Sequence, residues 1–400
     1  MSICYKCMTV NFMYDPANQR DANFAFLWPA FAAASASDMA AALARHFTNL
    51  AVGSDGPAAK EPEWTTAHAI TLELEGVRLL DFSTPAKDHR PGSYPVLLCA
   101  PFALHGAVIG DFAAGHSLVA TLRAAGLTRL FVTDWRSATP EMRHRGIDDY
   151  LAELNVLVDA IGAPVDLVGL CQGGFMALIY AARFPEKVRK LILVAAPVDI
   201  SAGSSTLSGV AEASPLAMFY EIVRLGDGLI PGRKVLKFWA PDLLEAEDIR
   251  QLLQVEAAPD SAAALRLEGR FREWYAWTLD LPGTFFLEAV EKLYKRNELA
   301  TGKFVALGQK IDLAAMRKPL YLLAARDDEL VAPAQLFAAE RLVGTPPHDL
   351  RKAIAPCRHL GLFMGKRILQ DVWPSVVRWL LEPAAAEAKH LEARAVAHAV

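Results

Sequence analysis

The stretch Val168-Gly169-Leu170-Cys171-Gln172-Gly173-Gly174-Phe175 decides the fold. It follows an apolar run at residues 165–169 that predicts a strand, and it opens a stretch at residues 173–184 that predicts a helix. A sharp strand-to-helix turn of the form G-x-S-x-G, here with cysteine in place of serine, is the setting of a nucleophile elbow. We therefore expect Cys171 to stand at the carboxyl edge of a sheet, where the positive end of the helix favours a thiolate.

Strand and helix patterns alternate on both sides of this turn. The other predicted strands lie at residues 68–74, 77–82, 95–100, 130–133, 190–195 and 320–324, with a weaker one at 351–355. The other predicted helices lie at residues 116–125 and 148–162, from residue 333 onward, and at 366–381. Alternation with short connections is the pattern of a mostly parallel central sheet with helices on both faces. The predicted fold class is therefore α/β.

The alternation stops after Pro197 and resumes near residue 316. The intervening region is helical in pattern, and its aromatic residues are expected to pack in a cap over the site; they include Trp239, Trp274, Trp277, Phe285 and Phe286. We divide the chain into an N-terminal helical extension (1–65), an α/β core in two parts (66–200 and 316–383), a helical cap insertion (201–315) and a C-terminal tail (384–400).

Composition and charge exclude several classes of protein. Hydrophobic residues make up 53% and charged residues 22% of the 400 residues, which excludes a largely disordered chain. The formal charge of −4, with no basic domain, gives no electrostatic basis for nucleic-acid binding. The sequence contains no uninterrupted apolar run of about 18 residues, so no transmembrane segment is predicted. The first 14 residues lack the pattern of a secretory signal.

The five cysteines do not form a recognisable disulfide framework, because their number is odd and their spacing irregular. Together with the missing secretory signal, this favours a reducing cytoplasm, in which a thiol can serve catalysis. Cys4 and Cys7 form a single C-x-x-C pair without further ligands nearby, so we predict no metal site. Cys99 and Cys357 are expected to be packing residues.

Two partners for Cys171 occur in the order nucleophile, acid, histidine that this architecture uses. The predicted strand at 320–324 runs into Asp327 and Asp328, and we prefer Asp328 as the acid because of the turn pattern that follows it. His359 lies in a loop just before the last helix. A free cysteine is more often a small buried apolar side chain, but these partners favour a Cys171-His359-Asp328 catalytic triad.

Each member of this triad has a chemical role. His359 takes the thiol proton, Asp328 holds the imidazole tautomer, and the thiolate attacks an acyl carbon. The backbone N–H of Gln172 is a predicted oxyanion donor, and the second donor is expected from Ala103 or Leu104 in the loop after the strand at 95–100. His105 and Trp277 are candidates for the lining of the substrate pocket.

The region from about residue 96 to 381 resembles polyhydroxyalkanoate synthases and the related intracellular polyhydroxyalkanoate depolymerases. The box at residues 169–174 is similar to the synthase box G-x-C-x-G-G. Further similar segments lie at residues 132–136, 148–150, 184–188, 195–199, 277–283, 293–299, 302 and 308–313, and the segment at 359–367 is similar to the depolymerase version. Asp328 and His359 match the family's catalytic aspartate and histidine. Glu329 and Arg358 depart from its usual histidine and glycine.

This resemblance implies an α/β-hydrolase fold and an acyltransferase that polymerises (R)-3-hydroxyacyl-CoA through an acyl thioester on Cys171. CoA is then a substrate and no cofactor is needed. The resemblance also implies a homodimer or a partner subunit, and a place at the surface of polyester granules. Two alternatives stay open: a depolymerase or esterase that hydrolyses 3-hydroxyalkanoate esters with the same triad, and a non-catalytic protein that binds polyester granules.

Overall fold

Eight strands form the central sheet of the computed structural model, which describes residues 59–89, 93–233 and 245–383. Their order is β1-β2-β6-β3-β7-β8-β13-β14. Their bounds are β1 Ala69–Glu73, β2 Val77–Asp81, β3 Val96–Cys99, β6 Leu130–Trp135, β7 Val165–Leu170, β8 Val188–Val194, β13 Leu320–Ala325 and β14 Leu350–Ala355. The strands from β6 to β14 run parallel, whereas β1 and β2 pair antiparallel at one edge.

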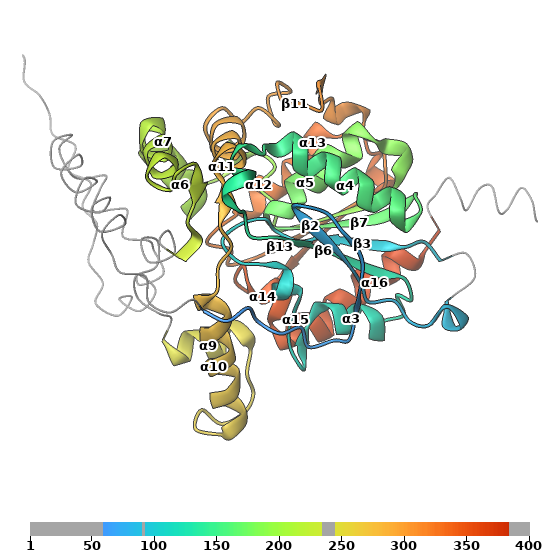
Figure 1. Cartoon of the computed structure of the whole chain (residues 1–400). Helices are drawn as coiled ribbons and strands as arrows, with labels where there is room; N and C mark the ends of the chain where they lie inside the picture. Colours follow the sequence, from blue (N-terminus) through green and yellow to red (C-terminus); the bar gives the residue numbers. More distant parts are fainter. Residues whose placement is uncertain (1–58, 90–92, 234–244, 384–400) are drawn as a thin grey trace, which may run out of the picture.

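Helices cover both faces of this sheet (Figure 1). Helices α4 (Ile147–Ile161) and α5 (Gln172–Arg183) lie on one face, and α3 (Leu118–Ala124) and α16 (Trp373–Leu381) lie on the other. The central strands β3, β6 and β7 are buried along their whole length, as expected for a sheet that is covered twice. The predicted α/β fold is therefore confirmed.

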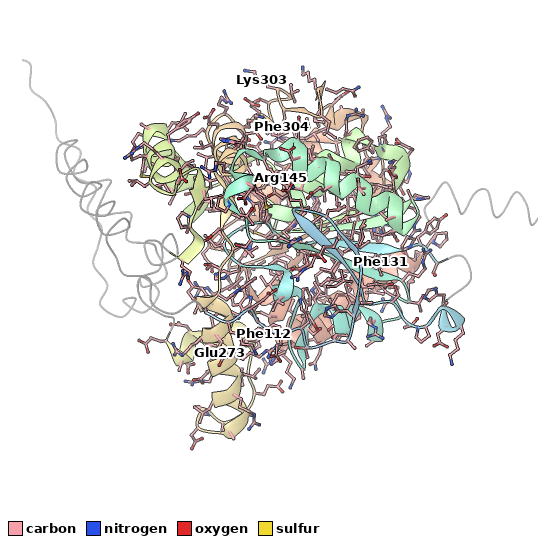
Figure 2. All side chains as sticks on the ribbon, viewed as in Figure 1. Phe112, Phe131, Arg145, Glu273, Lys303 and Phe304 are labelled. Carbon is pink, nitrogen blue, oxygen red and sulfur yellow. The ribbon has the colours of Figure 1, made fainter. Side chains whose placement is uncertain are left out.

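The region that interrupts the alternation is largely helical. Its elements are α6 Thr206–Ala213, α7 Leu216–Leu225, β9 Leu229–Ile230, α9 Ala246–Leu253, α10 Ala262–Ala276, β10 Leu281–Pro282, α11 Gly283–Glu288, the π-helix η8 Ala289–Lys295, β11 Val305–Ala306 and β12 Gln309–Lys310. Helices α6, α7 and α11 form one group and α9 and α10 another, both to the left of the sheet in Figure 1. Phe112 of the core packs its ring against Phe271 and Trp274 of α10 (Figure 2), so aromatic contacts join this region to the sheet domain.

Three predicted elements differ in detail from the structure. The helix expected at 116–125 begins with a short strand, β5 (His116–Ser117), which pairs with β4 (Asp111–Ala113). The helix expected from residue 333 is divided into α12 (Pro333–Phe337) and α13 (Ala339–Leu342). The helix expected at 366–381 is divided into α15 (Lys366–Asp371) and α16, because Pro374 has no N–H to continue the earlier helix and is accommodated near the start of a new one.

Two parts of the predicted division cannot be compared with the fold. Most of the N-terminal extension (1–65), including Cys4 and Cys7, lies outside the described residues, and so does the tail at 384–400. The short helix α14 (Gly361–Met364) follows the predicted loop histidine directly. The carboxyl ends of β3, β7, β13 and β14 carry the four segments from which the predicted site is built.

Candidate active site

Cys171 occupies a strained turn between β7 and α5. Its backbone has φ 48° and ψ −121°, a conformation with positive φ that non-glycine residues rarely adopt. The turn is held in place because the Cys171 amide donates to the carbonyl oxygen of Val194 on β8, at 2.8 Å. Strain of this kind gathers at functional sites, where the surrounding structure fixes it. The geometry is that of the nucleophile elbow expected from the sequence.

Glycines allow this turn to form. A Cβ atom on Gly173 would collide with the backbone carbonyl oxygens of Cys99 and Ala100 at the end of β3. A Cβ atom on Gly169 would collide with the backbone of Gly174. Backbone atoms cannot move aside as a flexible side chain can, so the elbow requires glycine at both positions.

His359 and Asp328 meet although they lie on separate loops. The His359 ring donates from Nδ1 to the carboxylate of Asp328, with distances of 2.8 Å to Oδ2 and 3.0 Å to Oδ1. Their side chains are 2% and 1% exposed, so the pair is shielded from solvent. The loops themselves are joined, because the Asp327 amide donates to the carbonyl oxygen of Cys357 at 3.1 Å.

The backbone fixes the carboxylate of Asp328. Its Oδ1 atom accepts hydrogen bonds from the amides of Leu330 and Val331, at 3.0 and 2.9 Å. The neighbouring Asp327 is instead 57% exposed at its side chain and pairs with Arg326. The structure therefore selects Asp328 rather than Asp327 as the partner of the histidine.

Electrostatics favour a protonated His359. Burial by itself lowers the pKa of this imidazole, but the carboxylate of Asp328 and the charge of Cys171 together raise its pKa well above its ordinary value. A hydrogen bond between Cys171 and the ring contributes to this rise in pKa. Nδ1 is engaged by Asp328, so Nε2 is the ring atom that remains for the sulfur. The arrangement can therefore hold a thiolate–imidazolium pair.

The predicted oxyanion donors lie at the start of α5 and on the loop after β3. Gln172 is the first residue of α5, so its amide has no acceptor within that helix. In the described part of the chain, the amides of Gln172, Ala103 and Leu104 have no hydrogen-bond acceptor. The Ala103 and Leu104 amides belong to the loop after β3, and Gly173 packs against Cys99 and Ala100 where that loop begins. The three N–H groups stay predicted donors to an oxyanion.

The two residues predicted to line the pocket contact each other. His105 Nδ1 lies 3.1 Å from the carbonyl oxygen of Trp277. The Trp277 ring covers the backbone of the next residue, Gly106, where an added Cβ atom would lie 2.7 Å from the ring. His105 and Trp277 thus join the loop after β3 to the helical insertion.

Sequence reasoning did not assign a role to Tyr294. It lies in the π-helix η8, a type of helix that is rare and frequent at functional sites. Burial raises the pKa of the Tyr294 phenol, and the charge of Cys171 adds to this rise. The phenol is therefore neutral near pH 7. The apolar and polar pattern of the sequence does not distinguish a π-helix from an α-helix, so it did not indicate this placement.

The other thiols have different surroundings. Burial raises the pKa of Cys99 to about 12, and burial together with the charge of Asp328 raises the pKa of Cys357 to about 12. Both thiols stay protonated near neutral pH, as expected for packing residues. Among the described residues, no cluster of three or more His, Cys, Asp or Glu side chains could hold a metal ion. Among the same residues, no helix is long and apolar enough to cross a membrane.

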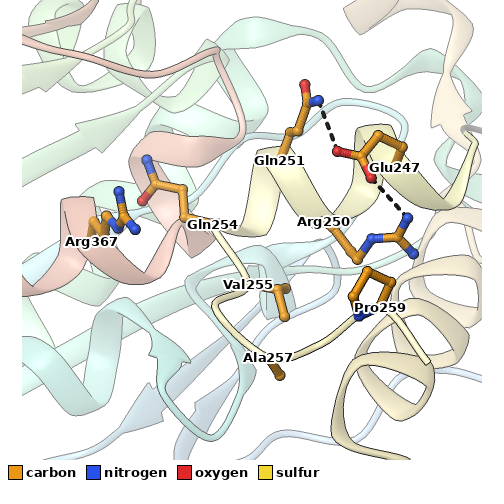
Figure 3. A pocket seen from close by; sticks show the side chains of 8 residues that line it. All are labelled: Glu247, Arg250, Gln251, Gln254, Val255, Ala257, Pro259 and Arg367. Carbon is orange, nitrogen blue, oxygen red and sulfur yellow. Dashed lines mark hydrogen bonds and ion pairs between the residues drawn. The ribbon is translucent and has the colours of Figure 1, made fainter. Parts of the chain in front are cut away.

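A pocket of about 350 Å³ opens on the surface between α9 and α15 (Figure 3). It is lined by Glu247, Arg250, Gln251, Gln254, Val255, Ala257, Pro259 and Arg367. Arg250 pairs with Glu247 and Glu268, and Arg367 pairs with Glu256. The pocket contains none of the predicted site residues, and its arginines are already neutralised by carboxylates.

Comparisons with known proteins agree with this fold. The family model described as alpha/beta hydrolase fold matches residues 116–366. The poly(3-hydroxyalkanoate) polymerase subunit PhaC of Synechocystis sp. is 29% identical over 68% of this chain and 74% of its own. The subunit of the same name from Allochromatium vinosum is 27% identical over 73% of this chain and 82% of its own. The one from Haloferax mediterranei is 25% identical over 79% and 64%, respectively.

These relatives confirm the resemblance that the motifs around Cys171, Asp328 and His359 first indicated. The matched region contains the elbow, the acid, the histidine and the whole of the helical insertion. The chain therefore belongs to the α/β hydrolase fold family, within which it is similar to the polyhydroxyalkanoate synthases.

Proposed function

We propose that this protein is an acyltransferase that polymerises (R)-3-hydroxyacyl-CoA, with Cys171 carrying the growing acyl chain as a thioester. The observation that supports this most directly is the elbow cysteine beside a buried histidine that is held by a carboxylate. The similarity to polymerase subunits indicates the substrate class. CoA enters as part of the substrate, so the reaction needs no cofactor.

Acylation uses all three predicted catalytic residues. The Cys171 sulfur attacks the thioester carbonyl carbon, and a new carbon–sulfur bond forms. The bond to the CoA sulfur then breaks, and the imidazolium of His359 gives its proton to the leaving thiolate. Asp328 accepts the hydrogen bond from Nδ1 throughout and keeps Nε2 directed at the reacting atoms.

Chain growth reverses the proton transfer. Nε2 of His359 accepts the proton of a 3-hydroxyl group, and that oxygen attacks the acyl carbon on Cys171. The carbon–sulfur bond to Cys171 breaks and an ester forms. A thioester exchanges between thiolates with little change in free energy, so a cysteine suits this chemistry. The amides of Gln172 and of Ala103 or Leu104 are the proposed donors to the oxyanion in both steps.

The test is acylation by (R)-3-hydroxybutyryl-CoA. Free CoA, turbidity and the mass of the Cys171 peptide are followed for the wild type, for Cys171→Ala and for Cys357→Ala. We expect CoA release and an acyl adduct on Cys171 in the wild type, loss of both in Cys171→Ala, and retention in Cys357→Ala because that thiol is buried and protonated. Turbidity identifies polymer.

Two outcomes would contradict the proposal. Free 3-hydroxybutyrate without polymer would identify a hydrolase with the same nucleophile. The absence of both an acyl adduct and CoA release would exclude acyl transfer from this thioester. The adduct requires only one turnover, so it reports acyl transfer to Cys171 separately from polymer formation. A granule-binding protein without catalysis would behave like Cys171→Ala.

A further inference from the structure

We propose that His105 is a positioning residue through which the helical cap (residues 201–315) sets the geometry of the oxyanion site. This inference rests on the proposed function, because it concerns how the acyl-transfer site is formed. It assigns to His105 a role other than the lining of a substrate pocket. The residues that carry it are His105, Leu104 and Gly106 on the loop after β3 and residues 277–279 of the cap.

The hydrogen bond of His105 has one direction only. A carbonyl oxygen cannot donate, so Nδ1 must carry the proton that it shares with the Trp277 oxygen 3.1 Å away. Burial lowers the pKa of His105 to about 4, so the ring is neutral near pH 7 and Nε2 carries no proton. The His105 side chain therefore cannot donate to an oxyanion from Nε2, and its donor is used up by the cap.

The cap fixes the His105 ring by packing as well. The ring lies against Trp274 and Tyr275 near the end of α10, with centroid distances of 4.5 and 5.0 Å and interplanar angles of 32° and 34°. Both neighbours come from the cap, and neither comes from the sheet. The orientation of a core-loop side chain is therefore set by cap residues.

Two further contacts join the same segments. The Leu279 amide donates to the carbonyl oxygen of Leu104 at 2.8 Å. The Trp277 ring lies directly over Gly106, with no room for a Cβ atom. The cap thus contacts three consecutive residues of the loop: the carbonyl oxygen of Leu104, the side chain of His105 and the Cα atom of Gly106.

The sheet holds the other end of the loop. Trp135 Nε1 donates to the carbonyl oxygen of Ala100 at 2.8 Å, and the Ala100 amide donates to Thr133 Oγ1 at 3.0 Å. The Ala103 amide lies between this sheet anchor and the cap anchor at Leu104. A displacement of the cap anchor would rotate the peptide groups before it and misalign their N–H vectors.

The cap segment is itself a firm support. The Asp280 amide donates to Ser137 Oγ at 2.9 Å, and the Ala138 amide donates to the Asp280 carbonyl at 2.8 Å. Its carboxylate accepts from the Gly232 amide at 2.8 Å. These bonds fix the cap segment, so it can hold the loop after β3 in position.

The experiment compares two reactions of the same sulfur. In the first, p-nitrophenyl butyrate acylates Cys171: the sulfur bonds to the carbonyl carbon, nitrophenolate leaves, and the oxyanion site is needed. In the second, iodoacetamide alkylates Cys171: the sulfur bonds to the methylene carbon, iodide leaves, and no oxyanion forms. The nitrophenolate burst and the alkylation of the Cys171 peptide are both timed under single-turnover conditions.

Two variants separate the hydrogen bond from the packing. His105→Phe keeps a ring between Trp274 and Tyr275 but has no donor at the Nδ1 position. We expect its acylation rate to fall about 10- to 100-fold, as for a displaced oxyanion donor, with its alkylation rate unchanged. His105→Asn places an amide N–H near the Nδ1 position, and we expect it to restore most of the acylation rate.

His89→Phe is the matched control. His89 also bonds a backbone carbonyl, that of Thr84 at 2.9 Å, but it precedes β3, and Thr84 is bonded to Thr128 just before the start of β6. We expect both rates to match those of the wild type. The midpoint of thermal unfolding is measured for every variant, so that a fall in acylation can be compared between proteins that are equally folded.

Each other result would overturn a stated claim. Unchanged acylation in His105→Phe, or acylation and alkylation that fall in parallel, would overturn the positioning role. A failure of His105→Asn to exceed His105→Phe would overturn the hydrogen bond as its cause. A wild-type protein with no burst that depends on Cys171 would contradict the proposed function, and the present inference with it.

Discussion

Cys171, His359 and Asp328 carry the chemistry at the scale of single residues, and their environments differ sharply. Cys171 is partly accessible, whereas His359 and Asp328 are almost completely buried. A nucleophile must meet its substrate, while the pair that orients it is most effective away from water, where the interaction between charges is strongest. The loop that carries His359 also holds Cys357, whose thiol stays protonated because burial and the adjacent carboxylates raise its pKa.

Replacement of Asp328 by Asn tests the electrostatics of His359. The pKa of His359 is raised in the folded protein, so protonation of the ring stabilises the fold fully below the unfolded pKa and ceases to do so as the pH rises through the folded pKa. In Asp328→Asn, the negative charge that raises the pKa of His359 is lost, so the lowering effect of burial on this pKa is opposed less strongly. We expect the variant to lose about 3 kcal/mol of unfolding free energy at pH 6 and less at alkaline pH.

Urea denaturation at pH 6 and above the raised pKa of His359 measures this difference. Asp327→Asn is the control, because the side chain of Asp327 is exposed and its partner is Arg326. We expect the control to change stability by less than about 1 kcal/mol at either pH. An equal loss in Asp328→Asn at both pH values would contradict the assignment of the raised pKa to this carboxylate.

At the scale of elements, the elbow depends on how closely β7, α5 and the end of β3 approach one another. Helix α5 starts immediately after Cys171, and its second residue, Gly173, touches the backbone at the end of β3. That contact places the first turn of α5 against the loop with the predicted oxyanion donors Ala103 and Leu104. The element geometry therefore creates the site as much as the side chains do.

Gly173→Ala tests this approach. The added Cβ meets the carbonyl oxygens of Cys99 and Ala100, so we expect a loss of at least about 2 kcal/mol of unfolding free energy. Gly269→Ala in the middle of α10 is the matched control, since no atom lies within 4 Å of its added Cβ. We expect the control to gain about 0.5–1 kcal/mol from higher helix propensity.

Chemical denaturation measures the free energy of unfolding of both variants and of the wild type. A Gly173→Ala protein as stable as the wild type would mean that the backbone at the end of β3 can move away without cost. The elbow would then not be fixed by this crossing.

At the scale of the whole molecule, a buried aspartate joins the sheet, the cap and a core helix. Asp199 follows β8 and is 3% exposed. It accepts hydrogen bonds from Ser201 at both the amide and Oγ, from Asn297 Nδ2 at 2.7 Å, and from Arg341 on α13. Asn297 comes just after the π-helix that carries Tyr294, so this cluster ties that part of the cap to the core.

Asp199→Ala removes the shared acceptor and leaves four donor groups, from three residues, without it. We expect a loss of about 2–4 kcal/mol in unfolding free energy at pH 7. Burial raises the pKa of Asp199, but the bonds from Ser201 and Asn297 and the charge of Arg341 outweigh it and lower the pKa overall. The contribution is therefore present above the unfolded pKa and is lost as the pH falls through the folded pKa.

Asp312→Ala is the comparison, because Asp312 accepts only the Ala314 amide at the start of a short exposed turn. Its loss is expected to stay below about 1 kcal/mol. Limited proteolysis follows the cap directly, and faster cleavage between residues 201 and 315 in Asp199→Ala than in Asp312→Ala would locate the loosening there. Identical cleavage patterns would place the effect elsewhere.

The sequence by itself determined the order of strands and helices, the elbow at Cys171, and the acid and histidine that follow it. These features are local: apolar runs of strand length, a glycine-rich turn, and polar residues just after strands leave their pattern in consecutive residues. The choice of Asp328 over Asp327 is also local, because the turn that follows it supplies the Leu330 and Val331 amides. The division of the last helix at Pro374 had a local signal as well, which the helical pattern around it outweighed.

Only the tertiary structure decided what meets across distant parts of the chain. The contact of His105 with Trp277 joins residues 172 positions apart, and the burial of Tyr294 depends on the packing of a π-helix in the cap. The cluster at Asp199 likewise gathers residues from β8, the cap and α13. Such contacts depend on the packing of whole elements and on burial that raises or lowers a pKa, and neither is written in any short stretch of sequence.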